Sequence, residues 1–144
     1  MPTHATFKTK GISTNPAKER IIYSVPSLAA DTGGPARSVT GLADAISRHS
    51  YQITLATLNI KSFSDIWITP AASDSEVVEI VELATITSRL ASQLWSYKIG
   101  KKISQLVLEK EVKLIHDNGV WQPFNVHVAI AAKRTITPLI ISTR

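Results

Sequence analysis

The chain has 144 residues, of which 44% are hydrophobic and 19% are charged, and these values fit one globular domain. The absence of cysteine excludes disulfide bonds, thiol nucleophiles and thiolate zinc sites. The net charge of +5 is concentrated at the start, since the first 20 residues hold four of the 16 cations and one of the 11 acids. It therefore gives only weak support to a nucleic-acid surface, and no nucleic-acid partner is assigned.

Residues 1–19 contain no apolar core of the kind that a secretory signal needs. We interpret them as a disordered basic leader that precedes a domain over residues 20–144. No run of 18 apolar residues occurs in the sequence, so no helix is expected to span a membrane. After the leader, short apolar runs alternate with segments of helical periodicity.

The first apolar run, 21–25, ends at Pro26 and predicts a strand that is buried on both faces. The loop that follows ends in Gly33 and Gly34. A helix is predicted from Pro35, because proline is favourable at the first helical position. One apolar stripe runs along this helix, formed by Val39, Leu42, Ala43 and Ile46.

Further along the chain, the helix that follows residue 87 is expected to break at Gly100. Trp67 and Trp95 are interpreted as packing residues. The remaining predicted elements are a strand over 52–58, an irregular segment over 59–75, a strand or short helix over 76–83, a helix over 88–110, a strand over 112–116, a loop over 117–123, a helix over 125–134 and a strand over 138–142.

This alternation of strands and helices predicts an α/β fold, in which a Rossmann-like parallel sheet carries helices on both faces. In such folds, ligands bind outside the carboxyl ends of the strands. The loop after Val25 and the loop after His116 both lie at that edge. We therefore look for function in these two loops.

The first loop has two interpretations. A glycine pair before a helix lets a ligand approach the backbone, and the amides of the first helical turn favour an anion, with Arg37 as an added charge. Alternatively, the loop is a tight turn from strand to helix and Arg37 is a surface cation. Neither the Gly-x-Gly-x-x-Gly pattern nor a Walker A loop is present, which removes support for dinucleotide binding and ATP hydrolysis by those devices.

The second loop also has two interpretations. His116, Asp117 and Asn118 could bond sugar hydroxyls, Trp121 offers a ring on which a sugar could stack, and His116 beside Asp117 could form an acid–base pair. Alternatively, these polar side chains satisfy local backbone groups, Asn118 and Gly119 form a turn, and Trp121 belongs to the core. No histidine pair has the spacing of a metal site, so no metal ligand is assigned.

Three segments in order resemble the N-terminal domain of the family 4 (group 1) glycosyltransferases, which are retaining, two-domain GT-B enzymes. The first runs from the apolar strand through Val25-Pro26-Ser27-Leu28 and Gly33-Gly34-Pro35-Ala36-Arg37-Ser38-Val39 to a helix that ends in Arg48-His49. The second is Val112–Asn125, which is similar to the family's IHxHGxW-x-P-x-N segment. The third, Pro138–Arg144, is similar to the strand that leads into xRGM. The resemblance as a whole extends over roughly residues 20–144.

The resemblance implies transfer of a sugar from a nucleotide-sugar to a glycan or lipid-linked acceptor, in bacterial polysaccharide or cell-envelope synthesis, without a cofactor or a bound metal. It implies a cytoplasmic location at the inner face of the membrane, with at most peripheral membrane contact. The roles that it implies are catalysis by His116 and Asn118, donor phosphate binding by Gly33, Gly34 and Arg37, and acceptor or sugar binding by Asp117, Gly119, Trp121, Asn125 and Arg144.

The sequence departs from the family pattern in two ways. Asn118 stands where many members have histidine, which removes an imidazole but keeps a hydrogen bond to a sugar hydroxyl. The family's donor-binding C-terminal domain is missing, so the chain is expected to be inactive alone and to need that domain in cis or in trans. The alternative is a non-enzymatic Rossmann-like module that binds a sugar or a partner chain and pairs with a separate donor domain.

Overall fold

The computed structural model describes residues 18–29, 31, 33–58, 60, 78–83 and 89–143, with side chains from residue 97 onward in the last range. The predictions for the leader up to residue 17, for Trp67, for the side chain of Trp95 and for Arg144 lie outside the described residues. The elements are β1 (Glu19–Val25), α1 (Gly34–Ser47), β2 (Tyr51–Thr57), β3 (Val78–Glu82), α2 (Arg89–Glu109), β4 (Leu114–Asn118), α3 (Pro123–Thr135) and β5 (Leu139–Ser142).

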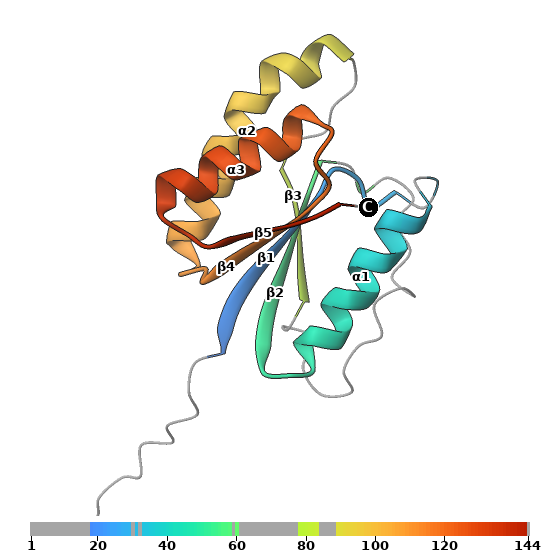
Figure 1. Ribbon diagram of the computed structural model, residues 1–144, viewed down its shortest axis with the longest axis vertical. Helices are drawn as coiled ribbons and strands as arrows, with labels where there is room; N and C mark the ends of the chain where they lie inside the picture. Colours follow the sequence, from blue (N-terminus) through green and yellow to red (C-terminus); the bar gives the residue numbers. More distant parts are fainter. Residues whose placement is uncertain are drawn as a thin grey trace, which may run out of the picture.

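The five strands form one parallel sheet in the order β3-β2-β1-β4-β5. α1 covers one face of this sheet, and α2 and α3 lie side by side on the other (Figure 1). The prediction of a Rossmann-like α/β fold with helices on both faces is therefore confirmed. The segment 76–83, which was ambiguous in sequence, contains the edge strand β3.

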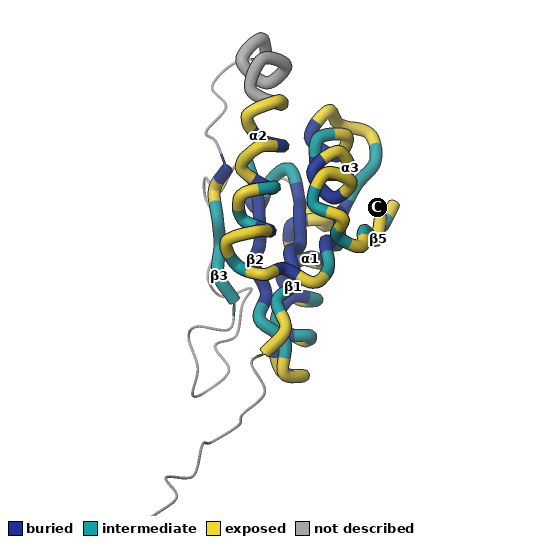
Figure 2. The backbone as a smooth tube through the Cα atoms, turned by 90° about the vertical axis from the view of Figure 1, so that its left-hand side faces the viewer, coloured by how far each residue is buried: buried dark blue, intermediate teal, exposed yellow. Residues whose placement is uncertain are grey.

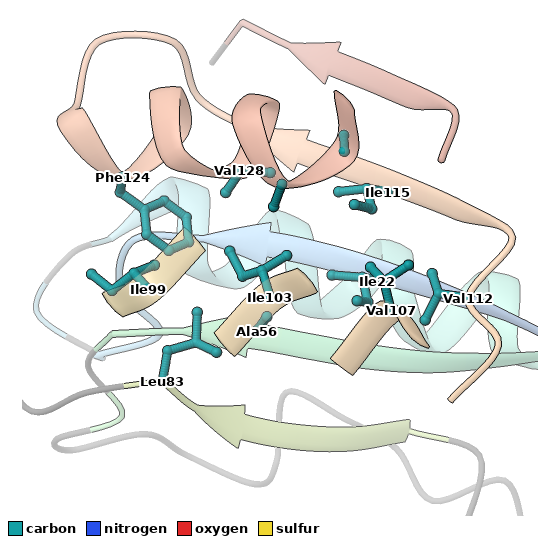
Figure 3. Packing of buried hydrophobic residues seen from close by; sticks show 12 residues of the cluster. Ile22, Ala56, Leu83, Ile99, Ile103, Val107, Val112, Ile115, Phe124 and Val128 are labelled. Carbon is teal, nitrogen blue, oxygen red and sulfur yellow. The ribbon is translucent and has the colours of Figure 1, made fainter. Parts of the chain in front are cut away.

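The central strands are buried on both faces because side chains of a strand alternate between the two helical layers. On β1, Tyr23 and Val25 pack toward α1, whereas Ile22 packs toward α2 and α3. The edge strands β3 and β5 are only partly buried, as Figure 2 shows. Figure 3 shows the larger core, in which Ile22 and Ile115 meet Ile99, Ile103, Val107, Phe124 and Val128.

The predicted break at Gly100 is wrong, since α2 runs unbroken from Arg89 to Glu109. Gly100 is buried where α2 meets α3, and a Cβ placed there would lie 3.4 Å from the backbone oxygen of His127. The glycine thus permits a close approach of two helices. Its low helix propensity costs roughly 1 kcal/mol, and the packing of the neighbouring turns outweighs that cost.

The strand predicted over 112–116 lies two residues further along the chain, at Leu114–Asn118. Val112 lies just after the turn that ends α2, where its amide donates to the carbonyl of Val107 and its side chain fills the core. As a result, Asp117 and Asn118 lie inside the strand and not in the loop that the sequence predicts.

At the amino edge of the sheet, Arg20 links three strands. Its guanidinium donates to Thr54 at 3.0 Å, to Gln52 at 2.8 Å and to Glu79 at 3.0 Å. Lys110, which directly follows α2, bonds the same Glu79 carboxylate at 2.7 Å. Because Arg20 is 18% exposed on its side chain, this network is partly screened from water and fixes the edge opposite to the predicted binding loops.

Replacing Gly100 with valine is expected to lower the free energy of unfolding by about 1–3 kcal/mol, because the added methyl groups push α2 away from α3. Gly41→Val in α1 is the matched control, since no atom lies within 4 Å of the Cβ position there. Urea denaturation of both variants measures the difference. Equal losses in the two variants would contradict the close-packing role of Gly100.

Candidate functional site

A cavity of about 230 Å³ lies between the carboxyl ends of β1 and β4. The sheet order places it at the switch point, where the chain leaves β1 toward β2 on one side and later returns to β4 on the other. Both predicted loops contribute to it: Pro26, Ser27 and Pro35 come from the first, and Gly119, Trp121 and Gln122 come from the second.

Asn118 forms part of the cavity wall and is 4% exposed. Its Nδ2 donates to the backbone oxygens of His116 at 3.1 Å and Ser24 at 3.3 Å. Its Oδ1 is buried and accepts no hydrogen bond from the described residues. A buried acceptor without a partner costs about 1–3 kcal/mol, so this oxygen is suited to receive a hydroxyl or amide proton from a ligand.

Trp121 lies at the rim of the cavity and is 88% exposed, so the alternative that it belongs to the core is wrong. The same side chain borders a second hollow of about 350 Å³, together with Val126 and His127 of α3. An indole ring exposed to this extent offers a flat apolar surface beside a polar cavity. That combination suits a ligand with one apolar face and several hydroxyl groups.

Asp117 is buried on the opposite side of the sheet from Asn118. It is 1% exposed, and its carboxylate accepts hydrogen bonds from the hydroxyl of Ser24 at 2.6 Å and from Nδ2 of Asn125 at 3.1 Å. Burial raises the pKa of Asp117 to about 6, although the hydrogen bonds from Ser24, Asn125 and the Asn118 backbone act in the opposite direction.

The Asp117 network holds the loop that bears Trp121. Asn125, bonded to Asp117, accepts a hydrogen bond from the amide of Gln122 at 3.2 Å through its Oδ1. Gly119 has a φ of 137°, and a Cβ there would lie 3.2 Å from Nδ2 of Asn125. Only glycine therefore fits, and the loop over 119–122 is fixed between β4 and α3. The contacts described here for Asp117, Gly119 and Asn125 are all made with other residues of the chain, and they support the loop.

His116 and Asp117 do not form an acid–base pair, because successive residues of a strand point to opposite faces. The His116 ring lies 4.8 Å from the Tyr23 ring, on the α1 side of the sheet. Its Nε2 is 2.6 Å from the Ser142 hydroxyl of β5. His116 therefore stands behind the cavity wall and is not among the residues that line the cavity.

The glycine pair and Arg37 begin α1 and are exposed, and they lie outside the lining of the cavity. Their neighbour Pro35 does line it. The structure therefore brings Asn118, Gly119, Trp121 and Asn125 together around the cavity. His116 and Asp117 act behind this wall, and the residues of the α1 amino terminus flank the opening.

Sequence reasoning missed two serine contacts, one buried at Ser24 and one partly buried at Ser142. Ser24 bonds Asp117, and Ser142 bonds His116. The available signal was a polar residue within an apolar strand, which in a sheet buried on both faces needs a hydrogen-bond partner. Within the part of the chain that the structure describes, no three His, Asp or Glu side chains are grouped to hold a metal ion. No described helix is long and apolar enough to cross a bilayer.

No protein-family model and no curated protein sequence matches the chain. Solved structures do match. A glycosyltransferase from Rickettsia africae has a TM-score of 0.58 at 14% identity, over 86% of this chain and 29% of that one. UGT2 from Phytolacca americana, solved with UDP-2-fluoro-glucose and pterostilbene, has a TM-score of 0.59 at 14% identity, over 88% of this chain and 30% of that one.

A domain of different function is equally similar. The C-terminal domain of a Pyrococcus furiosus hydrogenase has a TM-score of 0.58 at 13% identity, over 86% of this chain and 91% of that domain. These identities show the fold alone. The shared fold is a Rossmann-like α/β domain, and the chain spans about 30% of the length of the two glycosyltransferases that it resembles.

Replacing Asp117 with asparagine is expected to remove a pH dependence of stability. The folded-state pKa of about 6 exceeds the ordinary 3.8, so the folded protein binds the proton more tightly than the unfolded chain. The stability that this group provides is full below pH 4 and is lost as the pH rises through 6, by roughly 3 kcal/mol.

The measurement is urea denaturation of wild type and Asp117→Asn between pH 4 and pH 7.5. The wild type is expected to lose stability relative to the variant as the pH rises. Asp31→Asn, which alters an exposed carboxyl, is the control and should keep the wild-type profile. A constant difference between wild type and Asp117→Asn across this range would show that the buried carboxyl does not govern the pH dependence.

Proposed function

We propose that the chain is the acceptor-side, N-terminal half of a retaining GT-B glycosyltransferase of family 4. In this proposal the complete enzyme moves a sugar from a nucleotide-sugar to a glycan or lipid-linked acceptor in polysaccharide or cell-envelope synthesis. The observation that carries it is a buried acceptor, Asn118 Oδ1, which has no hydrogen-bond partner among the described residues and lies with the exposed ring of Trp121 at the switch-point cavity. Two of the segments with the family resemblance contribute to that cavity.

The chemistry proposed for the cavity is recognition of a sugar. Asn118 Oδ1 would accept a proton from one hydroxyl group, and the apolar face of the ring would stack against Trp121. At the start of α1, the backbone amides of Gly33, Gly34 and the first helical turn, together with the Arg37 guanidinium, would stabilise negative charge on the leaving diphosphate. No metal is assigned to this step, and His116 would act as a positioning residue behind Asn118.

The fold supports this assignment in general terms, since the glycosyltransferase neighbours are built on the same half-domain. The proposal also includes the family, the retaining outcome, a donor-binding half outside these 144 residues and a location at the cytoplasmic face of the membrane. A donor-binding domain would complete the cleft, either in the same polypeptide or in a separate one.

The alternative is a binding module without enzymatic activity. It is supported by the hydrogenase domain, which has a similar fold over nearly its whole length in a protein of another class. The two functions differ in what a donor half would add. Glycosyl transfer on addition of a donor-binding partner supports the enzyme, whereas unchanged sugar binding without transfer supports the module.

The sugar site can be tested on an array of bacterial oligosaccharides. The chain is expected to bind a subset of glycans, and Trp121→Ala should weaken this binding roughly five- to tenfold, since one aromatic contact is lost. Leu108→Ala is the matched control, because Leu108 is another exposed apolar residue remote from the cavity. Glycan binding that is the same in both variants would contradict a sugar site at Trp121.

The requirement for a second half is tested by transfer assays with radiolabelled UDP-glucose, UDP-N-acetylglucosamine and GDP-mannose. The acceptor in each assay is a bacterial lipid extract. The purified chain of 144 residues is expected to give no transfer above the rate without protein, because in this proposal the donor binds mainly to the other half of the enzyme. Turnover by the chain alone would contradict the need for a donor-binding half.

A further inference from the structure

The lining of the switch-point cavity is mainly apolar and carries no charge. Val25 ends β1 and Pro26 follows it, Pro35 lies in the first turn of α1, and Val120 belongs to the loop after β4. Among the described residues of the lining, none has a charged side chain. A charged ligand group would leave water here without meeting a counter-charge, so the cavity favours a neutral group.

The orientation of the Asn118 amide is fixed by the two hydrogen bonds that its Nδ2 donates. The acceptors are the backbone oxygens of Ser24 and His116. A rotated amide would place Oδ1 against these two carbonyl oxygens, so three acceptors would meet without a proton between them. Oδ1 is therefore the acceptor that remains, and it has no partner among the described residues. A ligand group that meets it has to donate a proton.

Ser27 supplies the complementary group in the same lining. Its Oγ accepts the amide proton of Ala29 at 3.1 Å, and within the described part of the chain its own hydroxyl proton is donated to no other residue. That proton can rotate toward a ligand. Ser27 follows β1 whereas Asn118 ends β4, so the cavity has a donor beside one strand end and an acceptor beside the neighbouring one.

A secondary amide matches this arrangement better than a hydroxyl group does. The N–H and C=O of a trans amide point in opposite directions, so one can meet Asn118 while the other meets Ser27. An N–H that donates to Oδ1 has no lone pair left to satisfy, whereas a hydroxyl group in the same place keeps two. The methyl group of an acetamido substituent would also remove apolar surface of Pro26 and Pro35 from water.

We propose that the switch-point cavity selects sugars that carry an acetamido group. This inference rests on the proposed function, because it takes the occupant of the cavity to be a sugar. The acetamido N–H donates to Asn118 Oδ1, its oxygen accepts from the Ser27 hydroxyl, and its methyl group packs against the two prolines of the lining. The sugar ring stacks on Trp121 at the rim. A free amino sugar or a uronic acid brings a charge that the lining does not balance.

The test is calorimetric titration of the full chain with methyl glycosides, with ligand-detected NMR for the weakest binders. The glycosides of N-acetylglucosamine and N-acetylgalactosamine are expected to bind roughly tenfold more tightly than those of glucose, galactose and glucosamine, because two hydrogen bonds and a methyl contact are gained. Ser27→Ala should reduce this preference roughly threefold, since one of the two hydrogen bonds is lost. Asn118→Ala should abolish the preference.

Ser104→Ala is the matched control, because Ser104 bonds the Gly100 carbonyl within α2 and does not line the cavity. It should keep the wild-type preference. Circular dichroism checks that the variants are folded. If Asn118→Ala does not fold, Ser27→Ala decides, since Ser27 is only partly buried.

Three results would overturn the proposal. Equal affinity for the glucose and N-acetylglucosamine glycosides would exclude selection of the acetamido group and would leave a sugar site at Trp121 standing. A preference that both cavity variants retain would show that the amide binds elsewhere. Failure of every glycoside to bind would also exclude sugar recognition at this cavity, whereas the need for a donor-binding half has its own test in the transfer assays.

Discussion

The pairing of β1 with β4 is the constraint on which the rest of the structure depends. These strands are far apart in sequence, yet their register aligns Tyr23 with His116 and Ser24 with Asp117. The pairing closes the crossover through β2, β3 and α2 and creates the crevice at the carboxyl ends. It also places Tyr23 and His116 together on the α1 side of the sheet, and Ser24 and Asp117 together on the opposite side. Without this register, neither the cavity nor the buried hydrogen bonds behind it would form.

The architecture could be predicted because hydrophobic periodicity reports it directly. A mostly apolar run before Pro26 and a stripe in α1 are local patterns, and their alternation leaves few topologies. The errors occurred where tertiary contacts override a local preference. Gly100 lowers helix propensity but gains close packing against α3, and Asp117 and Asn118 belong to a strand although their residue types favour loops.

The position of the candidate site could be predicted from the sequence, but the role of each residue in it could not. Parallel strands share a carboxyl edge, so two loops rich in glycine and polar residues were expected to meet. Which side of the sheet each side chain occupies depends on the register, and a shift of one residue would exchange the positions of Asp117 and Asn118. The exposure of Trp121 likewise depends on how α3 begins, which the Asp117–Asn125 contact determines.

The last two residues of β4 have different roles, because consecutive side chains of a strand point to opposite faces of the sheet. Asn118 lies at the cavity wall, whereas Asp117 faces the other layer and anchors the loop through Asn125. Substitutions at position 118 can therefore change what the cavity accepts without loosening the loop that shapes it. Over evolutionary time, such a strand end lets ligand preference drift while the fold stays under separate selection.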